Sequence, residues 1–263
     1  MTEILVTGAT GNVGGQVARR LGDAARPFSR RTGGDLSEPE TLEAALPGVE
    51  QVFLIWPFLG TEGAPGVLET IARHAKRVVY VSSSGVGVHD DPINLMHAGM
   101  ERLIEASGLE WTVLRADTIA SNALGWAGQI RASGVVRGPD IAATAVVHEA
   151  DVAAAAVTVL RDAGHAGAKH VLTGPEVLSR ADQVRLIGEA AGLSLRFEPQ
   201  PVEEARRRML DDGRPPALVE ALLAAASRSP SSLVTRTVEE LTGSPARTFA
   251  SWAREHADVY SSG

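Results

Sequence analysis

The chain contains no cysteine and only two tyrosines, Tyr80 and Tyr260, among its 263 residues. Without a thiol it cannot form a disulfide, use a thiolate nucleophile or bind a metal through sulfur, and this composition fits a reducing compartment. The seven histidines are scattered, and none has a partner at the helical or short-loop spacing of a metal-ligand set. The sequence therefore predicts neither a disulfide framework nor a metal site.

Long apolar runs are also missing, because no stretch approaches the roughly 18–20 residues of a membrane-spanning helix. The first apolar strand begins close to Met1, with no basic and then apolar leader before it. The formal net charge of −7 argues against a broad nucleic-acid surface. We therefore expect a cytoplasmic protein that binds a small molecule and neither nucleic acid nor membrane.

A glycine-rich turn is the most specific motif that is present. Residues 4–6 form a short apolar strand, and Gly8, Gly11 and Gly14 follow it before an amphipathic helix begins. In a dinucleotide-binding turn the first glycine permits the tight turn, the second leaves room for the pyrophosphate, and the third lets helix and strand pack closely. The helix N-terminus then offers free N–H groups to the anion. This order of strand, turn and helix predicts dinucleotide binding.

Apolar strands and helical patterns alternate through the first half of the chain. This alternation predicts a doubly wound parallel sheet, an α/β Rossmann fold that binds its ligand at the carboxyl ends of the strands. From residue 179 onward the sequence is mostly helical and is interrupted by prolines. We expect a dinucleotide-binding domain over 1–120 plus 146–173, and a smaller substrate lobe over 121–145 plus 174–263. The substrate would lie in the cleft between them.

The second strand indicates which cofactor is preferred. NAD-specific sites place Asp or Glu about 20 residues after the glycine turn. Here residues 26–31 contain no acid and three arginines, of which Arg30 and Arg31 are candidates for a 2′-phosphate contact. A guanidinium can bind a phosphate in a bidentate manner. We predict NADP(H) over NAD(H), with Arg30 favoured; the alternative is that these arginines are merely solvated. Asp35 and Leu36, just beyond, are placed at the adenine.

The chain resembles the NmrA-like branch of the atypical short-chain dehydrogenase/reductases. The resemblance covers nearly the whole chain and rests on residues 7–14, 34–36, 49–57, 97–101, 107–115, 149–153 and 238–249, together with Asn122. It implies a Rossmann fold, NADP(H) binding and a cleft between two lobes. It does not fix a substrate, because the branch includes both reductases of quinone-like compounds and redox-sensing regulators without turnover.

Enzymes of the wider superfamily use a Ser, a Tyr and a Lys, with the Tyr four residues before the Lys. Aligning on Glu101 places His97 at the Lys position and Ile93 at the Tyr position, so the usual proton-donating dyad is absent. His97 could bind the ribose or act as an acid, and it could equally be a helix residue without chemistry. Ser84 best matches the superfamily serine, although a serine triplet also suits a turn. Asn122 is a candidate for orienting a substrate carbonyl or capping a helix.

A quinone acceptor would not need a protein acid, because water can protonate its stabilised reduced anion, and positioning then supplies most of the acceleration. Phe58, Trp126 and Trp56 are candidate walls for a flat acceptor, although Trp56 fits a core position better. The predicted substrate contacts are thus Phe58, Ser84, Asn122 and Trp126, and the tentative catalytic residues are Ser84, His97 and Asn122. The predicted cofactor contacts are Gly8, Thr10, Gly11, Asn12, Val13, Gly14, Arg30, Arg31, Asp35, Leu36, Trp56, Pro57, Ser82, Ser83 and His97.

Three functions remain open at this point. The first is an NADPH-dependent reductase of a quinone or another conjugated carbonyl, which the well-developed second lobe favours. The second is a non-catalytic NADP-binding sensor that changes its affinity for a protein partner with redox state, which the missing dyad favours. The third is a non-redox isomerase on the same fold. Fold alone does not choose among them.

Overall fold

The computed structural model describes residues 3–228 and 232–261. Its main element is a six-stranded parallel sheet in the order β2-β1-β3-β4-β5-β7. The strands are β1 (Glu3–Thr7), β2 (Ala25–Phe28), β3 (Val49–Leu54), β4 (Arg77–Ser83), β5 (Glu110–Ala116) and β7 (Ala168–Leu172). The doubly wound α/β fold predicted from the sequence is thereby confirmed, and its strand order reverses between β1 and β3.

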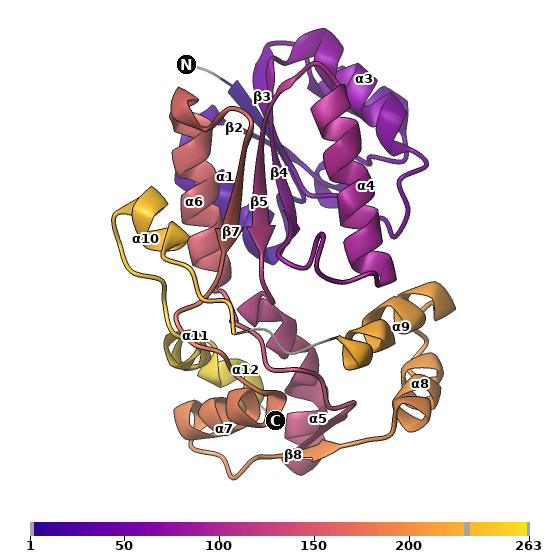
Figure 1. Ribbon diagram of the computed structural model, residues 1–263, viewed down its shortest axis with the longest axis vertical. Helices are drawn as coiled ribbons and strands as arrows, with labels where there is room; N and C mark the ends of the chain where they lie inside the picture. The colour runs from indigo at the N-terminus through magenta and orange to yellow at the C-terminus, as the bar shows by residue number, and fades with distance from the viewer. Residues whose placement is uncertain (1–2, 229–231, 262–263) are drawn as a thin grey trace.

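Helices cover both faces of the sheet (Figure 1). One core joins residues of the central strands to α2 (Pro39–Ala45), α3 (Ala64–His74) and α4 (Pro92–Ala106). The other core joins the opposite strand faces to α1 (Asn12–Leu21), α6 (Glu149–Arg161) and α10 (Thr237–Thr242). Because both faces are buried, the middle of each central strand is a run of mostly apolar residues, as in Val52–Leu54 and Val78–Val81.

Elements from the middle and the C-terminal part of the chain form a third core away from the sheet. They are the 3-10 helix η3 (Ala120–Trp126), α5 (Ala127–Ser133), β6 (Val135–Gly138), α7 (Arg180–Ala191), β8 (Arg196–Pro199), α11 (Phe249–Glu255) and α12 (Ala257–Ser261). Strands β6 and β8 pair in parallel and so connect the two segments that the sequence assigns to the smaller lobe. The division into two domains at the stated boundaries stays a prediction.

Helices α8 (Val202–Asp211) and α9 (Pro216–Leu223) form a hairpin with a small core of its own, built around Ala205, Val219 and Leu223. The hairpin stands at the side of the molecule, below α4 (Figure 1). Within the described part of the chain, no helix combines the length and apolarity that crossing a bilayer requires.

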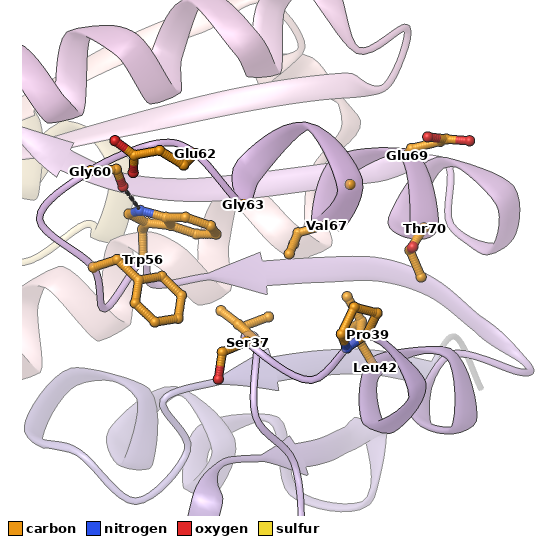
Figure 2. Close-up of a pocket in the computed structure, with 13 residues that line it drawn as sticks. Ser37, Pro39, Leu42, Trp56, Gly60, Glu62, Gly63, Val67, Glu69 and Thr70 are labelled. Atoms are coloured by element: carbon orange, nitrogen blue, oxygen red, sulfur yellow. Dashed lines mark hydrogen bonds between the residues drawn. The ribbon is translucent and has the colours of Figure 1, made fainter.

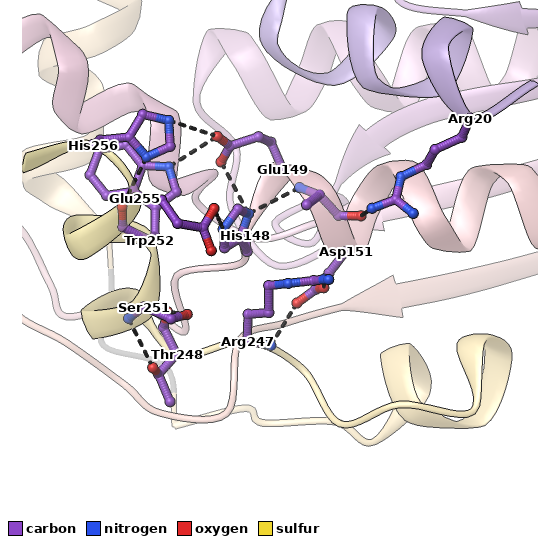
Figure 3. A network of polar contacts seen from close by, with 11 residues as sticks. Arg20, His148, Glu149, Asp151, Arg247, Thr248, Ser251, Trp252, Glu255 and His256 are labelled. Carbon is purple, nitrogen blue, oxygen red and sulfur yellow. Dashed lines mark hydrogen bonds and ion pairs between the residues drawn. The ribbon is translucent and has the colours of Figure 1, made fainter. Parts of the chain in front are cut away.

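The C-terminal helices are held against the start of α6 by a polar network (Figure 3). Trp252 on α11 donates its indole N–H to the buried carboxylate of Glu149 at 3.0 Å. The backbone N–H of Arg247 donates to Asp151 at 2.7 Å, and the Arg247 guanidinium pairs with the same carboxylate. His148 caps α6 by accepting from the backbone N–H of Ala150. These contacts fix the last part of the chain beside the carboxyl edge of the sheet.

Candidate functional site

The glycine turn after β1 has the geometry that the sequence predicts. Gly8 adopts a φ of +62°, a left-handed conformation that side chains disfavour, and its carbonyl accepts from the Gly11 N–H at 2.9 Å. A Cβ added to Gly14 would lie 2.3 Å from the Gly8 oxygen, far inside van der Waals contact. The turn and the helix behind it therefore require glycine at both positions.

Helix α1 presents an open N-terminus just beyond this turn. Its N-cap is Gly11 in an extended conformation, no side chain caps it, and no acidic residue lies in the first turn. Thr10 and Asn12 are exposed, whereas Val13 is buried in the core. Uncapped N–H groups with the positive end of the helix dipole form an anion site. This cradle fits the pyrophosphate of a dinucleotide.

Two arginines lie at the carboxyl end of β2. Arg30 and Arg31 form the short helix η2 (Arg30–Thr32), and both are exposed. Neither guanidinium makes a hydrogen bond or ion pair with any residue that the structure describes, although the charge of Arg30 helps to lower the pKa of the Asp35 carboxyl. Gly34 packs onto the Phe28 ring, where a Cβ would lie 2.4 Å from ring carbons. Two positive charges are thus available beside the predicted adenosine end, which suits a 2′-phosphate.

Asp35 follows this segment, and one of its carboxylate oxygens accepts hydrogen bonds within its own loop. One carboxylate oxygen accepts from the Ser37 N–H at 2.9 Å and from the Ser37 hydroxyl at 2.7 Å. The Ser37 backbone and hydroxyl hydrogen bonds hold the pKa of the Asp35 carboxyl below its usual value. Asp35 is therefore ionised at neutral pH, and its second oxygen could still accept from the adenine amino group.

A cavity of about 490 Å³ opens between α2 and α3, next to Leu36 (Figure 2). Trp56 and Phe58 form one wall, with ring centroids 4.9 Å apart, and the Trp56 indole N–H donates to the Gly60 carbonyl at 2.8 Å. Leu42 and Val67 contribute apolar side chains. The structure thus brings Leu36, Trp56 and Phe58 together at the predicted adenine end of the site.

Trp126 is not among the residues that line this cavity. It ends η3 and packs against the third core instead. The sequence places Phe58 and Trp126 on one acceptor, but the structure places Phe58 with Leu36 and Trp56. Contact of either residue with an acceptor stays a prediction, and so does contact of Pro57 with the cofactor.

The serines at the end of β4 differ in their hydrogen bonds. Ser82 donates to Glu101 at 2.6 Å, and Ser83 donates to the Asn94 side chain at 2.7 Å. Ser84 lies beyond the strand, where its hydroxyl meets the Asp117 carboxyl at the end of β5. Asn122 is exposed on η3. Ser82 and Ser83 therefore have protein partners, which sequence reasoning alone did not reveal.

Glu101 on α4 is the centre of a charged cluster. Its carboxylate, which is only 3% exposed, accepts from Ser82, from Arg115 at 2.6 and 2.9 Å, and from Lys169 at 3.0 Å. Burial alone would raise the pKa of Glu101, but the hydrogen bonds from Arg115, Ser82 and Lys169 outweigh it and lower that pKa. The cluster anchors the second half of α4 to β4, β5 and β7.

His97 lies one turn before Glu101 and contacts Tyr80, which does not stand at the superfamily's Tyr position. Its Nδ1 is 2.6 Å from the hydroxyl of Tyr80, which is fully buried in β4. Burial lowers the pKa of His97 to about 4 and raises the pKa of Tyr80 well above its ordinary value. His97 is therefore neutral at physiological pH.

Asp117 directly follows β5 and lies beside Ser84, and no sequence motif singles it out. It accepts from the Thr118 N–H at 2.6 Å, and burial raises the pKa of its carboxyl. Arg228, at the end of the α8–α9 hairpin, contributes positive potential here and binds Asp91 through two hydrogen bonds. No motif could have located this cluster, because its members come from distant segments. The cluster lies at the edge of the sheet formed by the carboxyl ends of β4 and β5.

Comparison with known proteins agrees with this geometry. A family profile described as NAD(P)H-binding matches residues 18–163. The chain is 37% identical to a (4-alkanoyl-5-oxo-2,5-dihydrofuran-3-yl)methyl phosphate reductase of Streptomyces griseus, over 98% of this chain and 99% of that protein. It is 31% identical to an NAD(P)H azoreductase of Xenophilus azovorans, again over 98% and 99% of the two chains.

Solved structures share the fold over nearly the whole chain. An NADPH-dependent quinone oxidoreductase of Escherichia coli, complexed with NADPH, superposes with a TM-score of 0.80 at 23% identity, covering 96% of this chain and 99% of that one. A Citrobacter triphenylmethane reductase complexed with NADP(H) gives a TM-score of 0.78 at 22% identity, over 97% and 99%. At this level of identity the likeness establishes the fold.

Proposed function

This chain belongs to the NAD(P)H-binding family and to its NmrA-like branch, and we propose that it is an NADPH-dependent reductase of a quinone or another conjugated carbonyl compound. The observation that carries the proposal is a candidate cofactor cradle on one sheet edge: a glycine turn, a helix N-terminus without a side-chain cap, and two exposed guanidinium groups that form no ion pair with a described residue. The full-length Streptomyces relative supports the acceptor class, since its named substrate is a 5-oxo-dihydrofuran bearing a second carbonyl group.

We assign each part of the cofactor to a different group of residues. The turn from Gly8 to Gly14 would hold the pyrophosphate, and Arg30 with Arg31 would bind a 2′-phosphate. The cavity beside Leu36 and Trp56 would take the adenine. A reduced nicotinamide cofactor, when bound, would supply the hydride for the reduction. The preference for NADP(H) over NAD(H) rests on the absence of a carboxylate from residues 26–31.

The acceptor would lie between the lobes, near the carboxyl ends of β4 and β5. His97 is neutral there and can donate a hydrogen bond without carrying a charge, and Ser84 and Asn122 can orient a carbonyl group. Ile93 cannot supply a proton at the superfamily's Tyr position. A conjugated acceptor suits this site, because its reduced form is a stabilised anion that solvent can protonate and positioning is the main catalytic device.

Calorimetry with NADPH, NADP⁺, NADH and NAD⁺ tests the cofactor assignment, and NADPH consumption with 1,4-benzoquinone or 2-cyclohexenone tests the reaction. We expect NADPH to bind more tightly than NADH and at least one acceptor to be turned over. The absence of the Tyr and Lys dyad favours a second function, an NADP-binding redox sensor. Binding of one oxidation state with no turnover of any acceptor would favour that sensor, and conversion without NADPH consumption would favour an isomerase.

A further inference from the structure

Two neighbouring side-chain contacts connect β4 to α4. Residues alternate across a strand, so Tyr80 and Ser82 share the face of β4 that packs on α4. His97 and Glu101 are four residues apart and share one face of the helix. Tyr80 meets His97 at 2.6 Å, with ring centroids 5.9 Å apart, and Ser82 meets Glu101 at 2.6 Å. The first contact joins a neutral phenol to a neutral imidazole.

The direction of the Tyr80–His97 hydrogen bond follows from what each group can donate. A neutral imidazole carries one N–H, on either Nδ1 or Nε2. If Nδ1 carried the proton, the buried Tyr80 hydroxyl would need another acceptor, and the described residues provide none besides His97. If Tyr80 donates to Nδ1, both groups are satisfied and the proton of His97 lies on Nε2. Nε2 itself has no partner among the residues that the structure describes.

The charged groups that act on His97 do not change this state. Glu101 and Asp91 both favour the protonated imidazole, but burial outweighs them. The carboxylate of Glu101 is also occupied by Ser82, Arg115 and Lys169. An imidazolium would need its Nδ1 proton to face the Tyr80 hydroxyl, whose own hydrogen then lacks an acceptor.

We propose that Tyr80 is a positioning residue that holds His97 in the Nε2–H tautomer, so that His97 offers one neutral hydrogen-bond donor to an oxygen atom of the bound reactants. The proposal rests on the proposed reductase function for the identity of that oxygen: the carbonyl of the acceptor or a hydroxyl of the nicotinamide ribose. A fixed donor can polarise a carbonyl without losing a proton. Tyr80 thereby contributes to the site from inside a strand.

The state of His97 can be read directly by ¹⁵N–¹H NMR of the histidine-labelled apo protein, with His97 assigned by the signals lost in His97→Gln. We expect the proton on Nε2 at pH 7 and no protonation of His97 above about pH 5, given its pKa of about 4. Tyr80→Phe removes only the hydroxyl and should give a mixture of tautomers. Tyr260→Phe is the matched control, because its buried hydroxyl has no partner in the described structure; the His97 signals should stay as in the wild type.

If the protein turns over NADPH and 1,4-benzoquinone, the same variants show which oxygen atom accepts the hydrogen bond from His97. Because only part of the His97 population then carries its proton on Nε2, kcat/KM of Tyr80→Phe should fall by up to about fivefold, the value of one neutral hydrogen bond. An unchanged NADPH Kd in calorimetry assigns the bond to the acceptor carbonyl, whereas a Kd raised by a similar factor assigns it to the ribose. A proton on Nδ1 in the wild type, a charged His97 at pH 7, or an unaltered tautomer in Tyr80→Phe would overturn the proposal.

These criteria separate the proposal from the reductase assignment. The tautomer is measured without cofactor or acceptor, so it can be confirmed in a protein that proves to be a sensor. If Tyr80→Phe does not fold, a proton on Nδ1 or a charged His97 in the wild-type spectrum at pH 7 still overturns the proposal.

Discussion

The guanidinium of Arg228 binds the carboxylate of Asp91 through two hydrogen bonds, of 2.8 and 2.9 Å, across 137 positions of the chain. Asp91 is the N-cap of α4 and also accepts from Asn94. Arg228 directly follows the 3-10 helix η5 (Ala224–Ser227), at the end of the α8–α9 hairpin. One ion pair therefore joins the loop beside the site to a hairpin that has only a small core of its own.

Replacing Arg228 with Ala should loosen the hairpin without unfolding the sheet. The pair is largely buried, with side-chain exposures of 26% and 6%, so its loss should cost about 1.5–3 kcal/mol. Hydrogen exchange should become faster in residues 202–223 and stay unchanged in β1 and β3. Arg207→Ala, an exposed arginine on α8, is the control and should leave exchange unaltered. Equal acceleration in both variants would contradict the anchoring role.

The contribution of the Arg228–Asp91 pair to the stability of the hairpin should also depend on pH. Burial alone would raise the pKa of Asp91, but hydrogen bonds from Arg228 and Asn94 lower it below its usual value. A carboxyl whose pKa is lower in the folded protein than in the unfolded chain stabilises the fold. This stabilisation is complete at a pH above the ordinary pKa of about 4, and it disappears as the pH falls through the lower pKa of the folded protein. The difference in hairpin exchange between wild type and Arg228→Ala should therefore shrink below about pH 4.

Arg30→Ala should weaken NADPH binding by about 1.5–3 kcal/mol and leave NADH binding almost unchanged, because only NADPH carries the 2′-phosphate. Calorimetry measures both affinities in one protein. Arg131→Ala, an exposed arginine on α5 without an ion pair among the described residues, should change neither. An equal loss for NADPH and NADH would show that Arg30 does not recognise the 2′-phosphate.

Gly14→Ala should disturb the cradle itself. The added methyl group would lie 2.3 Å from the Gly8 carbonyl oxygen, so turn and helix must separate. Overpacking of this kind costs about 1–3 kcal/mol of unfolding free energy, and NADPH affinity should fall with it. Gly128→Ala on α5 meets nothing within 4 Å and should be neutral or slightly stabilising. Thermal unfolding and calorimetry of the two variants test the contrast, which would fail if Gly14→Ala bound NADPH normally.

Glu101→Gln should destabilise the protein by about 3 kcal/mol, because it leaves Arg115 and Lys169 without their buried counter-charge. The value is at the low end for buried pairs, since both cations reach solvent. Glu105→Gln removes the exposed carboxylate that also binds Lys169 and should cost under about 1 kcal/mol. Urea unfolding at pH 7 measures both differences.

This stabilisation should be lost in acid. The pKa of Glu101 is lowered in the native state, so its contribution is complete above the ordinary value of about 4.3 and declines as pH falls through the lower native value. Stabilities of wild type and Glu101→Gln should therefore converge below about pH 4. A gap that stays constant down to pH 3 would show that Glu101 is not the titrating group.

The cofactor cradle could be predicted from the sequence because its parts are close together along the chain. Gly8, Gly11 and Gly14 act through backbone geometry, which spacing encodes directly, and Arg30 follows the next strand at the expected distance. The alternation of strands and helices fixes a parallel sheet for the same reason, since each unit is built from neighbouring residues. Likewise, the missing Tyr and Lys dyad is visible from residue types alone.

The surroundings of the reacting end were decided only by tertiary structure. Tyr80 lies inside β4 and 17 positions from His97, yet packing of β4 on α4 brings its hydroxyl to the His97 ring. In the sequence, Phe58 and Trp126 are equally suitable as aromatic walls for an acceptor. In the structure, Phe58 lines the cavity between α2 and α3, whereas Trp126 packs against the third core. Asp91 and Arg228 meet only because the C-terminal hairpin returns to the sheet. Contacts of this kind depend on how whole elements pack, and no local spacing in the chain records that packing.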